Sequence, residues 1–84
     1  MALGKEGSSL AAELNRLAGT TGKAEQGAAN TYASTTGLGI NAALNKKADA
    51  NRQPSAYKGL NAVCNELAST TGKSAVAALR SINV

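Results

Sequence analysis

The segment Leu10-Ala-Ala-Glu-Leu-Asn15-Arg-Leu-Ala-Gly-Thr-Thr-Gly22 contains the unit from which most of the chain is built. Its triplet Thr-Thr-Gly occurs three times, at residues 20–22, 35–37 and 70–72. An asparagine precedes each triplet by five residues, and these are Asn15, Asn30 and Asn65. A fourth, Asn45, continues the 15-residue spacing but has no triplet after it. Three matching triplets at fixed offsets in 84 residues indicate internal repetition.

The repeated unit has the periodicity of a helix rather than of a strand. Leu10, Leu14 and Leu17 follow the i, i+4, i+7 spacing of one helical face. We predict five short helices near residues 8–18, 23–33, 38–49, 55–68 and 73–82. About five residues are inserted near 50–55, and Pro54-Ser55 is expected to start the fourth helix. Residues 1–84 are therefore expected to form one all-α domain, a compact solenoid-like bundle of short helices joined by Thr-Thr-Gly turns.

The segments between helices contain the residues that end and begin helices. Gly19 is suited to end the first helix in a left-handed conformation, with Ser34 and Ser69 as poorer equivalents. A threonine of each triplet is expected to cap the next helix, and Ser8 or Ser9 to cap the first. Three glycines complete the turns, at Gly22, Gly37 and Gly72. We expect the repeated asparagines to bind the neighbouring turns rather than a ligand.

Half of the apparent core material is alanine. Of the 36 hydrophobic residues, 18 are Ala, and the only aromatic residues are two tyrosines. Such a core leaves little surplus over chain entropy, so the chain is expected to gain stability by docking. Small residues three positions before each asparagine slot are expected to let helices approach closely: Ala12, Gly27, Ala42, Ala62 and Ala77. The series three positions after each asparagine has the same expected role: Ala18, Ala33, Ala48 and Ala68.

The composition excludes several kinds of site. The chain has no histidine and one cysteine, Cys64, which removes histidine catalysis, disulfides and cysteine zinc clusters. Cys64 stands in a leucine slot of the repeat, and we interpret it as a buried small hydrophobe. The uncharged stretch 26–45 has the length of a membrane span but carries too many Asn, Ser and Thr residues to insert in lipid. We expect no cofactor, no metal and no membrane association.

Two further patterns have a functional and a structural interpretation. Gly72-Lys73-Ser74 resembles the end of a phosphate-binding loop, but the first glycine of that motif is replaced by Leu67. We therefore interpret it as a connector between helices. The net charge is +4, and the densest basic stretch comprises Lys46, Lys47, Arg52 and Lys58. These four residues are candidates for contact with phosphates or an acidic protein surface, although a solvated lysine-rich loop is the favoured interpretation.

The string Ser9-Leu-Ala-Ala-Glu-Leu-Asn-Arg-Leu-Ala-Gly-Thr-Thr-Gly22 resembles a family of small proteins from tailed bacteriophages of actinobacteria. The same holds for Gln26-Gly-Ala-Ala-Asn30 and Leu60-Asn-Ala-Val-Cys-Asn-Glu-Leu-Ala68. In that family, units of the type LNxLAGTTG and GAANxxAGTTGL recur along short chains, and related units appear beside or within minor tail proteins. The resemblance covers roughly residues 3 to 82, and it departs at Lys46-Lys47 and Ala50-Asn51-Arg52. It supplies no catalytic residues to carry over.

What the resemblance implies is a virion component made in a bacterial cytoplasm, without enzymatic activity. The expected role is a minor tail or tail-tip protein that binds other virion proteins through helix faces of Ala and Leu, in multiple copies of a symmetric assembly. A capsid decoration or minor capsid protein is the alternative within this class. A small basic nucleic-acid-binding protein is the alternative from a different class, although the missing aromatic residues disfavour stacking on bases. An enzyme is the third and weakest interpretation.

Overall fold

The computed structural model describes residues 9–82, and these form an all-α structure, as the sequence predicts. The helices of this part of the chain are α1 (Leu10–Ala18), α2 (Glu25–Ala33), α3 (Ile40–Ala48), α4 (Leu60–Ala68) and α5 (Ala75–Arg80), with a 3-10 turn η1 (Pro54–Ala56) between α3 and α4. Four of the helices have nine residues and α5 has six. Helices this short are marginal in water alone, so tertiary packing must stabilise them.

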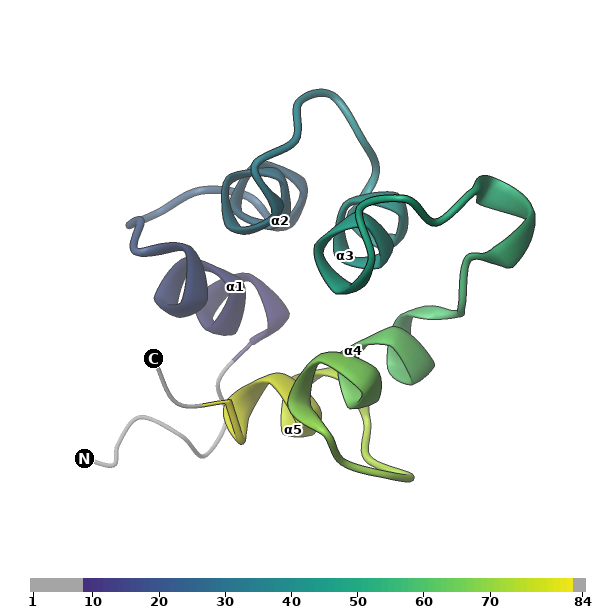
Figure 1. Ribbon diagram of the computed structural model, residues 1–84. Helices are drawn as coiled ribbons and strands as arrows, with labels where there is room; N and C mark the ends of the chain where they lie inside the picture. The colour runs from purple at the N-terminus through teal and green to yellow at the C-terminus, as the bar shows by residue number, and fades with distance from the viewer. Residues whose placement is uncertain (1–8, 83–84) are drawn as a thin grey trace.

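Each helix packs against the next along the chain, and α5 also packs against α1. Figure 1 shows the resulting arrangement, in which α1 to α5 follow one another around a ring and the chain returns to its start. The molecule measures 38 × 27 × 17 Å along its principal axes. The neighbour-to-neighbour packing is that of the expected repeat array, and the contact between first and last helix closes it.

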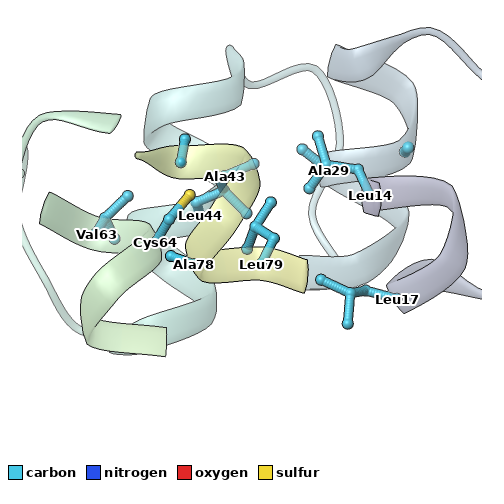
Figure 2. Close-up of a cluster of buried hydrophobic side chains, with 11 residues drawn as sticks. Leu14, Leu17, Ala29, Ala43, Leu44, Val63, Cys64, Ala78 and Leu79 are labelled. Carbon is cyan, nitrogen blue, oxygen red and sulfur yellow. The ribbon is translucent and has the colours of Figure 1, made fainter. Parts of the chain in front are cut away.

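The core is a cluster of small and medium side chains contributed by all five helices of the described part. Figure 2 shows Ala78 and Leu79 of α5 among buried side chains from the other four helices. The buried hydrophobic residues are Leu14, Leu17, Ala28, Ala29, Ala43, Leu44, Val63, Cys64, Ala75, Ala78 and Leu79. Alanines supply almost half of this set, so the expected thin core is present, and neighbouring helices meet through methyl groups.

One of the two predicted rows of small residues differs in burial from what the sequence suggested, whereas Ala33, Ala48 and Ala68 of the other row are half-buried against the core. In the row three positions before each asparagine slot, Ala12, Gly27 and Ala62 are exposed, Ala42 and Ala77 are half-buried, and none is fully buried between helices. The close contacts fall one and two positions before the asparagines, at Ala28, Ala29 and similar sites. A nine-residue helix has several candidate faces, and its own spacing does not distinguish two adjacent rows of alanine.

The predicted helix boundaries need correction by about two residues, and by five at the start of α4. Pro54-Ser55 does not begin the fourth helix but forms η1, after which Tyr57 is extended and Gly59 is the N-cap residue of α4. Proline is acceptable at the first position of either a 3-10 turn or an α-helix, so its position alone does not distinguish them. The expected helix start at residue 8 lies outside the described residues.

The predicted left-handed residues that end α1, α2 and α4 are confirmed. Gly19, Ser34 and Ser69 adopt left-handed conformations with φ of 74°, 61° and 59°. The glycine of each triplet is also left-handed, with Gly37 at φ 75°. A side chain at such a position is strained, which is why glycine recurs there. Ser9 caps α1 by accepting a hydrogen bond from the Ala12 amide at 3.1 Å, as one of the two predicted caps.

Candidate functional site

The side chain of Asn15 holds the segment between α1 and α2 by four hydrogen bonds. Its Nδ2 donates to the carbonyl oxygens of Ala11 and Lys23 at 2.8 and 2.9 Å. Its Oδ1 accepts from the Thr20 hydroxyl at 2.7 Å and from the Lys23 amide at 3.1 Å. These bonds use both donors and both lone pairs of the carboxamide, so no capacity remains for a ligand. We call this arrangement the asparagine clamp.

The same clamp recurs at Asn30 and at Asn65. Thr35 and Thr70 donate through their hydroxyls to Asn30 and Asn65, each at 2.8 Å. The backbone partners are Leu38 and Lys73, which both donate and accept, eight residues after each asparagine. The Nδ2 atoms of Asn30 and Asn65 also donate to carbonyl oxygens one turn earlier in the same helix, those of Gln26 and Asn61. The expectation that the asparagines bind the turns is confirmed, and the repeated unit is a helix with its own clamped connector.

The first threonine of each triplet therefore serves the preceding helix and not the following one. Its hydroxyl donates to the clamp asparagine, which corrects the expected role as an N-cap acceptor. The helices that follow the triplets are α2, α3 and α5, and their N-cap residues are Ala24, Gly39 and Ser74. Only Ser74 caps through its side chain, accepting from the Ala77 amide at 3.3 Å. The second threonines, Thr21, Thr36 and Thr71, are exposed.

The clamp at Asn45 is built from different residues. Its backbone partner is Lys58, 13 residues away instead of eight, with bonds of 3.1 Å to the Lys58 carbonyl and 2.9 Å from the Lys58 amide. The place of the threonine hydroxyl is taken by the Arg52 guanidinium, whose Nη1 donates to Asn45 Oδ1 at 2.9 Å. The whole α3–α4 connector, residues 49–59, is called the inserted loop below. Its clamp shows that an insertion was accommodated without giving up the repeated hydrogen bonds.

Arg52 also joins the inserted loop to α4. Its two terminal nitrogens donate to the two carboxylate oxygens of Glu66 at 2.9 and 2.7 Å. Lys58 Nζ lies 3.5 Å from the same carboxylate. The hydrogen bond from Arg52 is the main reason that the pKa of Glu66 lies below its ordinary value. The forked geometry fixes direction as well as distance, so Arg52 orients the loop on the helix.

The four predicted contact cations lie close together in the chain, but most of their heads have internal partners. Arg52 is engaged as described, and Lys46 Nζ donates to the carbonyl oxygen of Arg52 at 2.8 Å. Lys47 Nζ lies 4.7 Å from the centre of the Tyr32 ring, a cation–π contact between α3 and α2. Lys58 pairs with Glu66 and its side chain is 47% exposed. The stretch is thus mainly a structural network, with Lys47 and Lys58 accessible at its edges.

A shallow surface groove of about 560 Å³ runs beside α4 and the α4–α5 connector. Its lining includes Lys58, Ala62, Glu66, Thr71, Gly72 and Lys73. The segment that resembles a phosphate loop lies here, but Lys73 is bound through both its backbone groups to Asn65. The residues before it belong to α4, whereas a phosphate loop follows a strand. The connector interpretation accounts for every bond that is observed.

A hydrogen bond from Arg16, which is ion-paired with Glu13 within α1, joins α1 to α5 where the ring closes. Glu13 is 3% exposed and pairs with Arg16 at 2.9 Å, and Arg16 Nη2 donates to the Leu79 carbonyl at 2.8 Å. The equivalent slots of the other helices hold Ala28, Ala43, Val63 and Ala78. In the sequence, the one indication that Glu13 has a special role is that it is charged at a repeat position otherwise filled by small hydrophobic residues. Arg80 occupies the fifth asparagine slot.

The remaining chemical candidates are buried or absent from the described part of the chain. Cys64 is fully buried, and burial raises its pKa to about 11, which keeps the thiol protonated and unreactive near neutral pH. Among residues 9–82, no three His, Cys, Asp or Glu side chains lie close enough together to hold a metal ion. No helix in that range has the length and hydrophobicity needed to cross a bilayer. Comparison of the chain with family models, with curated proteins and with solved structures gives no match.

Proposed function

We propose that this protein is a non-enzymatic structural component of a tailed-bacteriophage particle, most simply a minor tail or tail-tip protein that binds other virion proteins. The observation that supports a structural rather than a ligand-binding role is the internal use of the repeated asparagine side chains, and the phage assignment rests on the resemblance of the repeat units. The carboxamides and the first threonine of each triplet, which a ligand-binding repeat would present, are engaged in the clamps. Binding to another molecule would therefore use the outer surface of the folded domain, as in a protein–protein contact.

The thin core supports the same proposal. The large buried side chains of the described residues are four leucines, one valine and Cys64, and the other five buried hydrophobes are alanines. At about 1.5–3 kcal/mol for each large aliphatic side chain, this core gives a modest stability. A partner that binds only the folded state adds stability by mass action. Membership of an assembly would therefore help to keep such a small module folded.

The expected docking surface must be revised within this proposal. Every leucine among residues 9–82 is buried or half-buried, so the Ala and Leu stripes that were expected to face a partner pack inside the ring. The outer surface carries small residues such as Ala12 and Ala62, exposed threonines, dispersed charged residues and the inserted loop. Recognition would depend on shape and hydrogen bonds more than on a large hydrophobic patch.

The nucleic-acid alternative has less support from the charges. Three of the cations, Arg16, Arg52 and Lys58, are paired with carboxylates. Phosphate contacts would have to come mainly from dispersed lysines such as Lys23, Lys47 and Lys73. Retention on duplex DNA with a steep salt dependence would favour this alternative, and absence of retention at low salt would exclude it.

The proposal is tested by protein analysis of purified particles of the phage that encodes the chain, with heads and tails separated before digestion. A structural role predicts the chain in purified particles at a constant ratio to the main structural proteins, and enrichment in the tail fraction for a tail role. Enrichment in the head fraction would instead favour the capsid alternative. Presence in the infected lysate together with absence from purified particles would contradict a virion role of either kind.

A further inference from the structure

The inserted loop, residues 49–59, is the place where the chain departs most from its own repeat. The other connectors between asparagine and backbone partner span eight residues, and this one spans 13. Figure 1 shows η1 at the outer edge of the molecule, displaced from the ring of helices. No residue of η1 is buried, and Ala50, Asn51 and residues 53–56 are all exposed. The loop tip therefore adds nothing to the hydrophobic core.

The loop is nevertheless ordered by many polar contacts. Arg52 binds Asn45 and Glu66, as described above, and Lys46 holds the Arg52 carbonyl at 2.8 Å. Within the loop, the Asn51 amide donates to Asp49 Oδ1 at 3.0 Å, and the Ala56 amide donates to the Gln53 carbonyl at 2.8 Å. Ordering exposed residues costs conformational entropy that no burial at the tip offsets. Binding a partner with a loop that is already ordered avoids that cost at the moment of association.

The tip itself carries no charge, because Lys46 and Arg52 turn inward and the exposed Asp49 and Lys58 lie at the two ends of the loop. Arg52 and Lys46 direct their heads to Glu66, Asn45 and the loop backbone, which leaves Gln53, Pro54, Ser55 and Ala56 at the surface. This tip is uncharged, carries a hydroxyl and a carboxamide, and has a proline that limits its backbone freedom. In repeat proteins, an insertion in one unit commonly lies on the binding face.

We propose that the inserted loop is the element that docks this protein onto its neighbour, and that the facing surface of the neighbour is an uncharged protein surface offering hydrogen-bonding groups. The inference rests on the proposed function and names the part of the chain that would carry it. Arg52 acts as a positioning residue, because it holds the tip through Asn45 and Glu66 without forming part of the exposed surface. A charged neighbour would meet no free charge on residues 53–56.

The test is incorporation of tagged copies, expressed in the host during infection by the unmodified phage, into purified particles. In the loop variant, residues 49–57 are replaced by Gly-Thr-Thr-Gly, the sequence of residues 19–22, which restores the eight-residue connector. We expect the variant to keep its helical circular dichroism and its cooperative melting, and to be incorporated roughly tenfold less than the tagged original. Equal incorporation of the two would overturn the inference. If the tagged original and the native chain are both missing from particles, the proposed function itself fails.

Single substitutions separate the chemistry of the tip from its length, and they also apply if the loop variant does not fold. Ser55→Asp and Ser55→Lys each place a charge on the exposed tip, and both are expected to lower incorporation severalfold if the facing surface is uncharged. Thr36→Asp is the matched control, since it charges an exposed residue of a regular connector and should leave incorporation unchanged. An increase with either charge would show that the neighbour is charged and would contradict the proposed chemistry. An equal loss in the control would show that the loop has no special role.

Discussion

The regular connector after α4 and the inserted loop after α3 are held by the same kind of asparagine clamp, built from different residues. In both, the chain leaves the end of a helix and passes beside that helix, where the asparagine side chain binds it, before the next helix begins. The regular connector uses the Thr70 hydroxyl and the backbone of Lys73, eight residues after Asn65. The inserted loop uses the Arg52 guanidinium and the backbone of Lys58. The carboxamide is therefore the constant element, and its hydroxyl partner is replaceable by any well-placed donor.

The largest loss of stability is expected when the asparagine carboxamide of a clamp is removed. Asn45 is fully buried, and Asn45→Ala leaves the Lys58 amide and the Lys58 carbonyl without their side-chain partner and removes one acceptor of Arg52. At about 1–3 kcal/mol for each unsatisfied buried group, we expect a loss of about 3 kcal/mol or more. For a domain of this size that would lower Tm by roughly 12–24 °C.

The control for this substitution is Asn51→Ala, because Asn51 is exposed and its side chain makes no hydrogen bond in the described residues. Thermal melting followed by circular dichroism compares the two variants. Similar melting temperatures for Asn45→Ala and Asn51→Ala would show that the clamp does not hold the inserted loop.

The next largest effect concerns the backbone conformation of the regular connectors, which the inserted loop does not share. Gly37 has φ 75° and an added Cβ would meet no atom within 4 Å, so Gly37→Ala introduces only conformational strain. That strain is expected to cost about 1–2 kcal/mol. Gly39→Ala is the control in the same connector, since Gly39 has φ −68° and equally open surroundings. A larger loss of stability for Gly39→Ala in urea unfolding would contradict the assignment of this turn.

A smaller effect is expected from the replaceable donor. Thr70→Val removes the hydroxyl that binds Asn65 and keeps the shape of the side chain. The expected cost is about 1 kcal/mol, the net contribution of one hydrogen bond. Thr71→Val changes the neighbouring exposed threonine and should have almost no effect. Chemical denaturation of both variants distinguishes a clamp donor from a solvent-exposed hydroxyl, and equal stabilities would remove the distinction.

The smallest effect, and one specific to the inserted loop, is a pH dependence from Glu66. Hydrogen bonding to Arg52 lowers the pKa of Glu66 in the folded state below the ordinary value of 4.5. The stabilisation is therefore fully present above about pH 4.5 and is lost as the pH falls through the folded-state pKa. Glu66→Gln should lower Tm slightly at pH 7, by less than Thr70→Val does, and this difference should shrink towards pH 3.

Glu25→Gln is the matched control, because Glu25 is exposed and forms no ion pair within the described part of the chain. Tm is measured from pH 7 to pH 3 for both variants and the original. A difference between Glu66→Gln and the original that stays constant over this range would contradict the assigned role of the ion pair.

Much of the local structure follows from the sequence alone. The helices, the left-handed residues at their ends and the binding of each asparagine to its connector were all predictable. The reason is that each regular clamp involves residues within eight positions, so its geometry is contained in the repeated motif. The same locality explains why the boundaries near Pro54 and the capping role of the threonines were misjudged. Several local hydrogen bonds compete there, and sequence spacing does not rank them.

The tertiary structure decided the features that depend on residues distant in the chain. Arg16 reaches the Leu79 carbonyl across 63 positions, and Arg52 reaches Glu66 across 14. Neither pair is part of the repeat, so no periodicity indicated it. The structure also decided which row of alanines is buried and that the leucines face inward, because burial depends on where the neighbouring helices lie. The sequence by itself thus determined the repeating helix and its clamped turn, and only the folded ring determined its closure and the surface left for a partner.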